Sequence, residues 1–374
     1  MAGATQFKYA IIGGGMAGLS TAWFLAERVP AQEICLFTHQ PKISSATASY
    51  AAAGMLAPVH ELDFTELPLL HFARHSLELH RRWAKIFSGA SYQFNGTLEV
   101  ALTPDDVPFL ERQFRFHRQE NLAVKWLETN ALQDLLPGLS ARVPAGIFAP
   151  DDGRVNPRKL THSIREALAG KGVRITEVAA PVEVSALSQA GATLTAGVES
   201  VRSEQVILAN GAGSVPGAPP PPEKIFPVRG QMLRLREETP GSLAYPLRIR
   251  NRAYGNAYIV PRDGSLVLGS TSEEMGHRSY LTGGGVLDIL RKCYAAYPEI
   301  YELDLQESWV GFRPASLSRK PVIARHPQLP VFWVNGLYRH GILLGPAVGQ
   351  AAAALVLEGK AFSLDEFSAK KSSP

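Results

Sequence analysis

A glycine-rich turn near the start of the chain constrains the fold more than any other feature of the sequence. Gly13, Gly15 and Gly18 follow an apolar segment, residues 7–12. Behind them, segment 17–26 carries apolar residues at helical spacing. In such a strand, turn and helix, the first glycine permits the turn, the second lets a pyrophosphate approach the backbone, and the third lets helix and strand pack closely. The free N–H groups that begin the helix also favour phosphate, so the pattern predicts a dinucleotide-binding unit.

The remaining helix and strand patterns predict an α/β fold. A second apolar run, residues 34–37, follows the first helix, and this crossover lays the two strands parallel. Beyond the proline-rich segment 216–222, alternating apolar and polar residues predict antiparallel strands. The other predicted elements are helices at 69–87, 105–120 and 157–169, a half-exposed strand at 96–102, strands at 173–175 and 206–209, antiparallel strands at 231–236, 257–260 and 265–269, and a strand, loop and helix over 331–357.

Composition excludes several classes of protein. The 38 basic and 34 acidic residues give a net charge of +4 without long basic runs, so nucleic-acid binding is not expected. The apolar segment 341–357 is rich in glycine, alanine and proline and is shorter than the roughly 20 residues of a membrane span, which predicts a buried turn and helix. With only Cys35 and Cys293 and no signal-peptide pattern, we expect a reduced, cytoplasmic protein without a membrane anchor.

One pair of histidines has the spacing of a metal site. His71 and His75 stand four residues apart on the predicted helix 69–87. No glutamate follows His71 in the metalloprotease pattern, and the basic residues around the pair indicate a solvated face. We therefore expect no bound metal.

The glycine turn does not by itself decide the cofactor. An acidic residue commonly closes the second strand and binds the ribose hydroxyls, but Thr38 occupies that place here, followed by His39. A hydroxyl group accepts a hydrogen bond less strongly than a carboxylate does. The missing acid, with Lys42 nearby, would also suit a phosphorylated ribose, so NADP stays open at this point.

Small residues dominate the segment after the second strand. Residues 44–58 read SSATASYAAAGMLAP, and small side chains let a flat, wide ligand pack against the backbone. The segment resembles the D-amino-acid-oxidase-type FAD-dependent oxidoreductases, and its AAGML part resembles their glycine-oxidase group, the amine oxidases of thiazole (thiamine) biosynthesis. The resemblance continues along the chain in the segments DGRVNPR (152–158), PVRGQML (227–233), YIVP (258–261), GFRP (311–314) and YRHGILL (338–344).

The resemblance implies a Rossmann-like FAD-binding domain and a discontinuous, mixed α+β substrate domain that contains an antiparallel sheet. We expect the FAD-binding domain to comprise residues 1–85, 149–215 and 312–374, and the substrate domain residues 86–148 and 216–311. The order of the predicted elements also favours two domains that exchange the chain more than once.

The resemblance further implies which residues bind FAD. In addition to Gly13, Gly15 and Gly18, they are Met16, Ala17, Thr38, His39, Ala53, Gly54, Met55, Val182, Leu337, Tyr338, Arg339, His340, Gly341, Ile342 and Leu343. Thr38 departs from the family's usual glutamate, and Leu337 stands where a histidine is common. Neither cysteine lies in a motif that tethers flavin, and Tyr50 stands near the position where some relatives attach flavin through a histidine. We therefore expect non-covalent FAD.

Three residues are implied at the site of the reaction. Arg313 matches the arginine that binds the substrate carboxylate, which a guanidinium can hold through two parallel hydrogen bonds and a lysine cannot. Tyr258 and Arg339 match residues that line the same pocket, where Tyr258 would bind the carboxylate and Arg339 would stabilise charge on the reduced flavin. Without the resemblance, a surface or ion-paired arginine and a core tyrosine are the plainer interpretations.

The implied activity is oxidation of glycine, sarcosine or another small amino acid or amine. A hydride passes from the α-carbon to flavin N5, giving an imine and then an oxo acid with ammonia or an amine, while oxygen becomes hydrogen peroxide. The alternatives are a dehydrogenase that passes electrons to a carrier, an enzyme of a tRNA side chain, which the modest net charge disfavours, and a non-catalytic flavin-binding partner subunit. The resemblance also implies a homo-oligomer, expected to be a tetramer.

Overall fold

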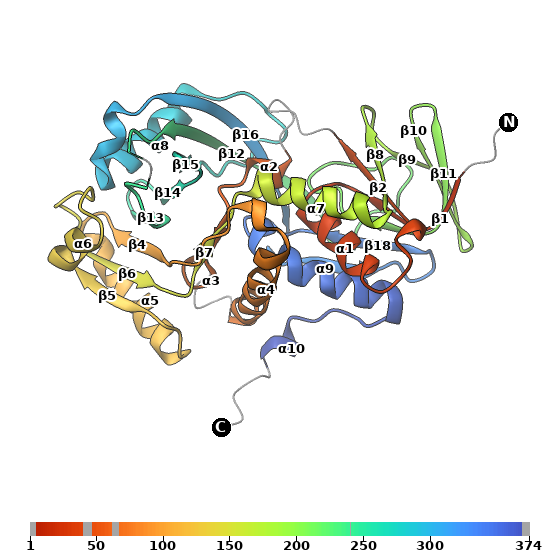
Figure 1. The fold of residues 1–374 in the computed structure, drawn as a ribbon, viewed down its shortest axis with the longest axis horizontal. Helices are drawn as coiled ribbons and strands as arrows, with labels where there is room; N and C mark the ends of the chain where they lie inside the picture. Colours follow the sequence, from red (N-terminus) through yellow and green to blue (C-terminus); the bar gives the residue numbers. More distant parts are fainter. Residues whose placement is uncertain (1–4, 40–46, 62–66, 240, 369–374) are drawn as a thin grey trace.

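Two eight-stranded sheets organise the molecule. The computed structural model describes residues 5–39, 47–61, 67–239 and 241–368. The sheets lie toward opposite ends of the long axis, with α4 (Leu67–Ile86) near the middle (Figure 1). The segment 44–46 and Lys42, which entered the cofactor prediction, lie outside the described residues.

The first sheet is largely parallel and contains the glycine turn. Its strand order is β17-β18-β11-β1-β2-β8, in which β1 pairs in parallel with both β2 and β11. A hairpin of β9 and β10, which the sequence did not predict, extends the sheet through antiparallel pairing with β11. The strand bounds are β1 (Thr5–Ile12), β2 (Ile34–His39), β8 (Arg174–Val178), β9 (Glu183–Ser188), β10 (Gly191–Ala196), β11 (Glu199–Leu208), β17 (Val322–Arg325) and β18 (Val331–Asn335).

Two apolar helices pack tightly beside this sheet. α1 (Met16–Ala26) is buried from Met16 to Leu25, and α9 (Gly341–Glu358) packs against both α1 and α4. A Cβ at Gly349 would lie 2.4 Å from the backbone of Ser20, so this close approach depends on glycine. By length and composition α9 would be able to span a membrane, but 67% of it is buried inside the protein. The prediction of a buried turn and helix at this place is confirmed.

The second sheet is mostly antiparallel, as predicted. Its order is β16-β12-β15-β14-β13-β4-β6-β5, with one parallel pair between β13 and β4. Helix α8 (Gly283–Ala296) packs on β12, β13, β14 and β15. The strand bounds are β4 (Thr97–Ala101), β5 (Lys125–Glu128), β6 (Ala145–Ala149), β12 (Ile225–Arg236), β13 (Leu247–Arg250), β14 (Ala257–Pro261), β15 (Ser265–Gly269) and β16 (Leu305–Ser316).

The prediction of a half-exposed strand at 96–102 was wrong in its exposure. β4 exists, but all five of its residues are buried, because side chains pack on both of its faces. Leu98 and Val100 face the core of the second sheet, and Glu99 Oε2 lies 3.2 Å from His60 Nδ1 on the other face. Its charged residue, Glu99, is compensated by Arg250, whose Nη2 lies 2.6 Å from Glu99 Oε1. A buried ion pair thus accounts for an acidic residue in a strand that has no exposed face.

The remaining elements connect these layers. The prediction of helices near 105–120 and 157–169 is confirmed, and the predicted α/β fold with an antiparallel second sheet matches the structure. The bounds of these remaining elements are α2 (Ala48–Ala51), β3 (Met55–Leu56), α3 (Pro58–Glu61), α5 (Val107–Gln119), α6 (Thr129–Leu135), β7 (Gly153–Arg154), α7 (Pro157–Lys171) and α10 (Asp365–Ser368), with short 3-10 helices at Ala31–Glu33, Ser88–Ala90, Pro104–Asp106 and Pro298–Glu302.

Candidate functional site

A cavity of about 760 Å³ joins the two sheets. Its wall includes the glycine turn, the end of β2, residues 47–55 and the loop after β11, all from the part of the chain around the first sheet. Strands β12, β14 and β16 line it from the second sheet, and residues 337–343 close it. The volume lies near the upper end of the range for small-molecule sites, about 300–1,000 Å³, which suits a ligand as large as a dinucleotide.

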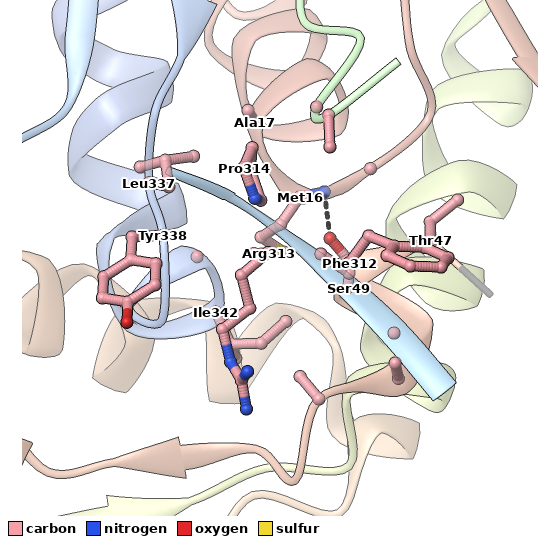
Figure 2. A pocket seen from close by; sticks show the side chains of 18 of the residues that line it. Met16, Ala17, Thr47, Ser49, Phe312, Arg313, Pro314, Leu337, Tyr338 and Ile342 are labelled. Carbon is pink, nitrogen blue, oxygen red and sulfur yellow. Dashed lines mark hydrogen bonds between the residues drawn. The ribbon is translucent and has the colours of Figure 1, made fainter. Parts of the chain in front are cut away.

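The glycine turn has the geometry that a pyrophosphate requires. Gly13 has a φ of 122°, and a Cβ there would lie 2.2 Å from the carbonyl oxygen of Ala209. Gly15 occupies the N-cap position of α1, where no side chain caps the helix, and the amide of Met16 donates to Ser49 Oγ at 2.8 Å. Figure 2 shows this hydrogen bond on the cavity wall. Apart from the Met16 amide, whose hydrogen bond Ser49 accepts, the start of α1 presents its backbone at the cavity wall, at the positive end of a helix.

Thr38 lies at the end of β2, where the ribose of a dinucleotide is expected. Its side chain is buried, and its Oγ1 donates to the carbonyl oxygen of His39 at 3.1 Å. A Cβ at Gly14 would lie only 1.9 Å from Thr38 Oγ1, so Thr38 and Gly14 fit one another. The Nδ1 of His39 lies 2.9 Å from the carbonyl oxygen of Val178, which fixes the imidazole beside β8. A hydroxyl, rather than a carboxylate, is therefore the group that this strand end offers.

The small residues after the second strand bring two distant segments together. A Cβ at Gly311, on β16, would lie 2.5 Å from the Cβ of Ala51. Gly54 has a φ of 97°, and a Cβ there would lie 2.0 Å from the carbonyl oxygen of Val155. These contacts leave no room for larger side chains and hold the two walls of the cavity close together. Small residues at these positions thus line the cavity and allow its surrounding segments to pack closely.

Arg313 reaches the cavity from β16 and has no carboxylate partner among the described residues. Its Nη1 donates to the carbonyl oxygen of Thr271 at 3.2 Å, and its Nη2 donates to Ser270 Oγ. A Cβ at Gly230 would lie 2.6 Å from Nη1, so the guanidinium lies directly over that glycine. Figure 2 shows Arg313 in the same cavity as Met16. The guanidinium is oriented by neutral groups and keeps its charge for an anionic ligand.

Tyr258 and Arg339 lie in the same cavity. The hydroxyl of Tyr258 donates to Met232 Sδ at 3.2 Å, and burial raises the pKa of this phenol. The hydroxyl therefore stays protonated at neutral pH and is available as a donor. The Nη2 of Arg339 donates to the carbonyl oxygen of Glu61 at 3.0 Å, which ties the loop 337–343 to α3.

The structure brings nearly all of the predicted site residues together. Every predicted cofactor or substrate residue lines the cavity except Gly18 and His340. Gly18 lies behind the turn, where a Cβ would be 1.9 Å from the carbonyl oxygen of Gly13, so its place is at the packing of helix against strand. His340 is buried at the start of α9, with its Nδ1 3.6 Å from Glu61. Gly18 and His340 therefore lie beside the cavity lining, and the position of Gly18 fits the packing role expected for the third glycine of the turn.

Several polar residues of the cavity were missed by the sequence analysis. They lie in helices α2 and α3, in strand β13 and in loops next to the strands of the second sheet: Ser49, Glu61, Arg248, Asn256, Ser270, Ser272 and His277. Arg248 carried a usable signal, since Leu247 and Ile249 alternate with Arg248 and Arg250. This alternation indicates a strand with one charged face, and the structure places Arg248 on the cavity wall.

Comparison with protein families identifies one match that covers most of the chain. The family model described as FAD dependent oxidoreductase, DAO, matches residues 8–355. A bifunctional protein ThiO/ThiG from a Synechocystis species is 30% identical over 357 residues, which are 94% of this chain and 51% of the relative. The chain therefore spans about half the length of that relative.

Relatives of similar length carry another name. A glycine oxidase from Geobacillus kaustophilus is 29% identical over 377 residues, with 97% of this chain and 96% of the relative covered. The crystal structure of glycine oxidase from the same organism superposes with a TM-score of 0.85 at 27% identity, covering 99% of this chain and 100% of that chain. This similarity extends through both sheets and the cavity between them.

Proposed function

Because this chain belongs to the DAO family of FAD-dependent oxidoreductases, we propose that it oxidises the amine of glycine, sarcosine or another small amino acid. The predictions of the family and of FAD as the cofactor are confirmed by the match over residues 8–355. The cavity fits FAD, since it has a glycine cradle at one end and close walls formed by small residues. The resemblance to glycine oxidases along the full chain supports a small amino acid as the substrate.

The position of Arg313 is the observation that carries this proposal. A half-buried guanidinium without a carboxylate partner opens into the same cavity as the dinucleotide cradle, within the described part of the chain. Arg313 would hold the substrate carboxylate through two hydrogen bonds, and Tyr258, kept protonated by burial, would donate a third. Holding the carboxylate fixes the α-carbon in one place, which contributes to the rate through orientation.

The chemistry itself needs few side chains. FAD held in this cavity would supply a two-electron acceptor for a hydride from the α-carbon of a neutral amine, which would leave as an imine. Water then converts the imine to an oxo acid and ammonia, or an amine from a secondary amine. The residues of the chain bind and orient the substrate, and Arg339 places positive charge on the wall where Leu337 and Tyr338 close the cavity. We propose oxygen as the final electron acceptor, giving hydrogen peroxide.

The peroxide assay tests the electron acceptor. FAD-loaded protein mixed in air with glycine, sarcosine or a small D-amino acid is expected to consume oxygen and release hydrogen peroxide in equal amounts. A protein that reduces an artificial dye without releasing peroxide would instead be a dehydrogenase that serves a carrier. A protein that does neither would favour the non-catalytic partner subunit.

We propose the division into an FAD-binding domain of residues 1–85, 149–215 and 312–374 and a substrate domain of residues 86–148 and 216–311. We also propose non-covalent FAD, since Cys35 and Cys293 are both buried away from the cavity lining and burial raises the pKa of the Cys35 thiol to about 11. A cytoplasmic homo-oligomer with a part in thiamine biosynthesis completes the proposal.

A further inference from the structure

A second guanidinium, that of Arg248, lines the cavity without a short ion pair. Its side chain is 14% exposed, and its Nε is buried without a hydrogen-bond partner among the described residues. The nearest carboxylate oxygens, of Glu61 and Glu99, lie 3.9 Å away, beyond hydrogen-bond distance. Glu99 is already ion-paired with Arg250, because its Oε1 accepts hydrogen bonds from Arg250 Nη2 at 2.6 Å and from Arg250 Nε at 3.1 Å. Arg248 therefore keeps donors for a ligand.

The sheet places Arg248 beyond Tyr258, on the side away from Arg313. Arg248 lies opposite Tyr258 in the pairing of β13 with β14, and Tyr258 lies opposite Gly269 in the pairing of β14 with β15. Directly opposite residues share one face of a sheet. Two strand spacings of about 4.8 Å separate the backbone of Arg248 from that of Gly269 by roughly 10 Å. The residue after Gly269 is Ser270, whose Oγ accepts a hydrogen bond from Arg313 Nη2. Tyr258 thus stands between the two guanidinium groups.

Two arginines of the cavity, Arg248 and Arg313, share few acidic neighbours. Among the described residues that line the cavity, Glu61 carries the one carboxylate. The carboxylate of Glu61 has two basic neighbours. Its Oε2 lies 3.6 Å from His340 Nδ1, and its Oε1 lies 3.9 Å from Arg248. Burial lowers the pKa of Arg248, which means that its charge is held at a cost. An anionic group bound beside Arg248 would offset that cost and satisfy its free N–H groups.

We propose that the preferred substrate is a small amino acid with a second carboxylate, whose α-carboxylate binds Arg313 and whose distal carboxylate binds Arg248. This inference rests on the proposed function, since it names the substrate class of the same site. Arg248 and Gly269 lie two strands apart on one face of the sheet, with Tyr258 between them, so the two arginines can bind separate carboxylates of one ligand. Arg248 contacts Glu61 and Glu99 only at 3.9 Å, so neither carboxylate forms a short ion pair with it.

Binding of a ligand that cannot be oxidised tests this inference without turnover. Calorimetry of the FAD-loaded protein compares succinate with succinamate, which has the same shape but a neutral amide in place of one carboxylate. We expect succinate to bind at least about tenfold more tightly, since hydrogen bonds between charged groups are the stronger ones. Equal affinities in the unmodified protein would overturn the inference.

Three variants assign the preference to the residue. Arg248→Gln is expected to bring the two affinities within about twofold of each other, and Arg248→Lys to keep part of the preference through its charge. Arg252→Gln is the matched control, because it removes an exposed arginine from the turn that follows the same strand, outside the cavity lining. Arg252→Gln should keep the full preference. If Arg248→Gln keeps it as well, Arg248 does not bind the second carboxylate.

Turnover separates this inference from the proposed function. The ratio of kcat/KM for D-aspartate to that for D-asparagine is expected to exceed ten in the unmodified protein and to fall toward one in Arg248→Gln. If no amino acid reduces the flavin, the proposed oxidation fails, while the ratio of succinate to succinamate affinity still decides the role of Arg248. If glycine is oxidised but both ratios equal one, the oxidation stands and the diacid preference is overturned.

Discussion

The guanidinium of Arg313 can bind an anionic ligand because of the residues around it. A side chain at position 230 would collide with the guanidinium, and the groups that do bond to it, Ser270 and Thr271, are neutral. An arginine oriented by neutral acceptors keeps its full charge for a carboxylate. The glycine at 230, the hydroxyl of Ser270 and the backbone carbonyl of Thr271 therefore together position the guanidinium.

Replacing Arg313 gives the most direct prediction at the scale of one residue. Arg313→Ala is expected to raise KM for amino acids roughly 10- to 100-fold while FAD stays bound, since two charge-assisted hydrogen bonds to the substrate are lost. The KM of Arg313→Lys should lie between that of the unmodified protein and that of Arg313→Ala, because a lysine cannot form the bidentate pair with a carboxylate. Steady-state kinetics and the flavin absorbance of each purified variant provide the measurement. An unchanged KM would remove Arg313 from the substrate site.

The sequence predicted some residues of the cavity and missed others. Arg313 and Tyr258 were found because they stand inside recognisable motifs, whereas Arg248 stands in a short alternating strand that no motif marks. Alternation shows that one face of a strand is polar, but it does not tell whether that face meets solvent or an internal cavity. Ser270 and His277 were missed for a related reason, since loop and strand-end positions depend on how the second sheet curves over the first.

The strand, turn and helix formed by β1 and α1 is the element that the sequence specified best. The glycine spacing predicted the turn, the parallel pairing of β1 with β2 and the open start of α1, and all three are present. The burial of β4 was not predictable, because its alternating pattern is ordinary for a half-exposed strand. Its burial follows from neighbours on both sides and from Arg250, which come from distant parts of the chain.

A matched pair of glycine substitutions tests the turn. Gly13→Ala is expected to destabilise the protein by at least about 2 kcal/mol and to weaken FAD binding, because alanine disfavours positive φ and its Cβ would meet the carbonyl of Ala209. Gly170→Ala, in helix α7 with open space around it, should instead stabilise by about 0.5–1 kcal/mol. Urea unfolding of both variants gives the two values. Similar, small effects at both positions would contradict the role given to the turn.

At the scale of the whole molecule, the function depends on joining two sheets around one cavity. The chain leaves the first sheet after β2, builds β4 to β6 of the second, and returns for β8 to β11. It then leaves again for β12 to β16 and returns for β17 and β18. The glycine cradle and Arg313 therefore come from different sheets, and neither sheet alone would hold both (Figure 1). Composition and periodicity predicted the two kinds of sheet, but only the resemblance to known flavoproteins indicated that their edges meet at a site.

The anaerobic absorbance spectrum of the FAD-loaded protein tests the central claim most directly. Glycine, sarcosine and small D-amino acids, including D-aspartate, are added one at a time in the absence of oxygen. The account predicts that at least one of them bleaches the flavin band, that the colour returns when air is admitted, and that Arg313→Ala requires a much higher concentration. A flavin that stays oxidised with every one of these amino acids would contradict the claim that this cavity oxidises small amino acids.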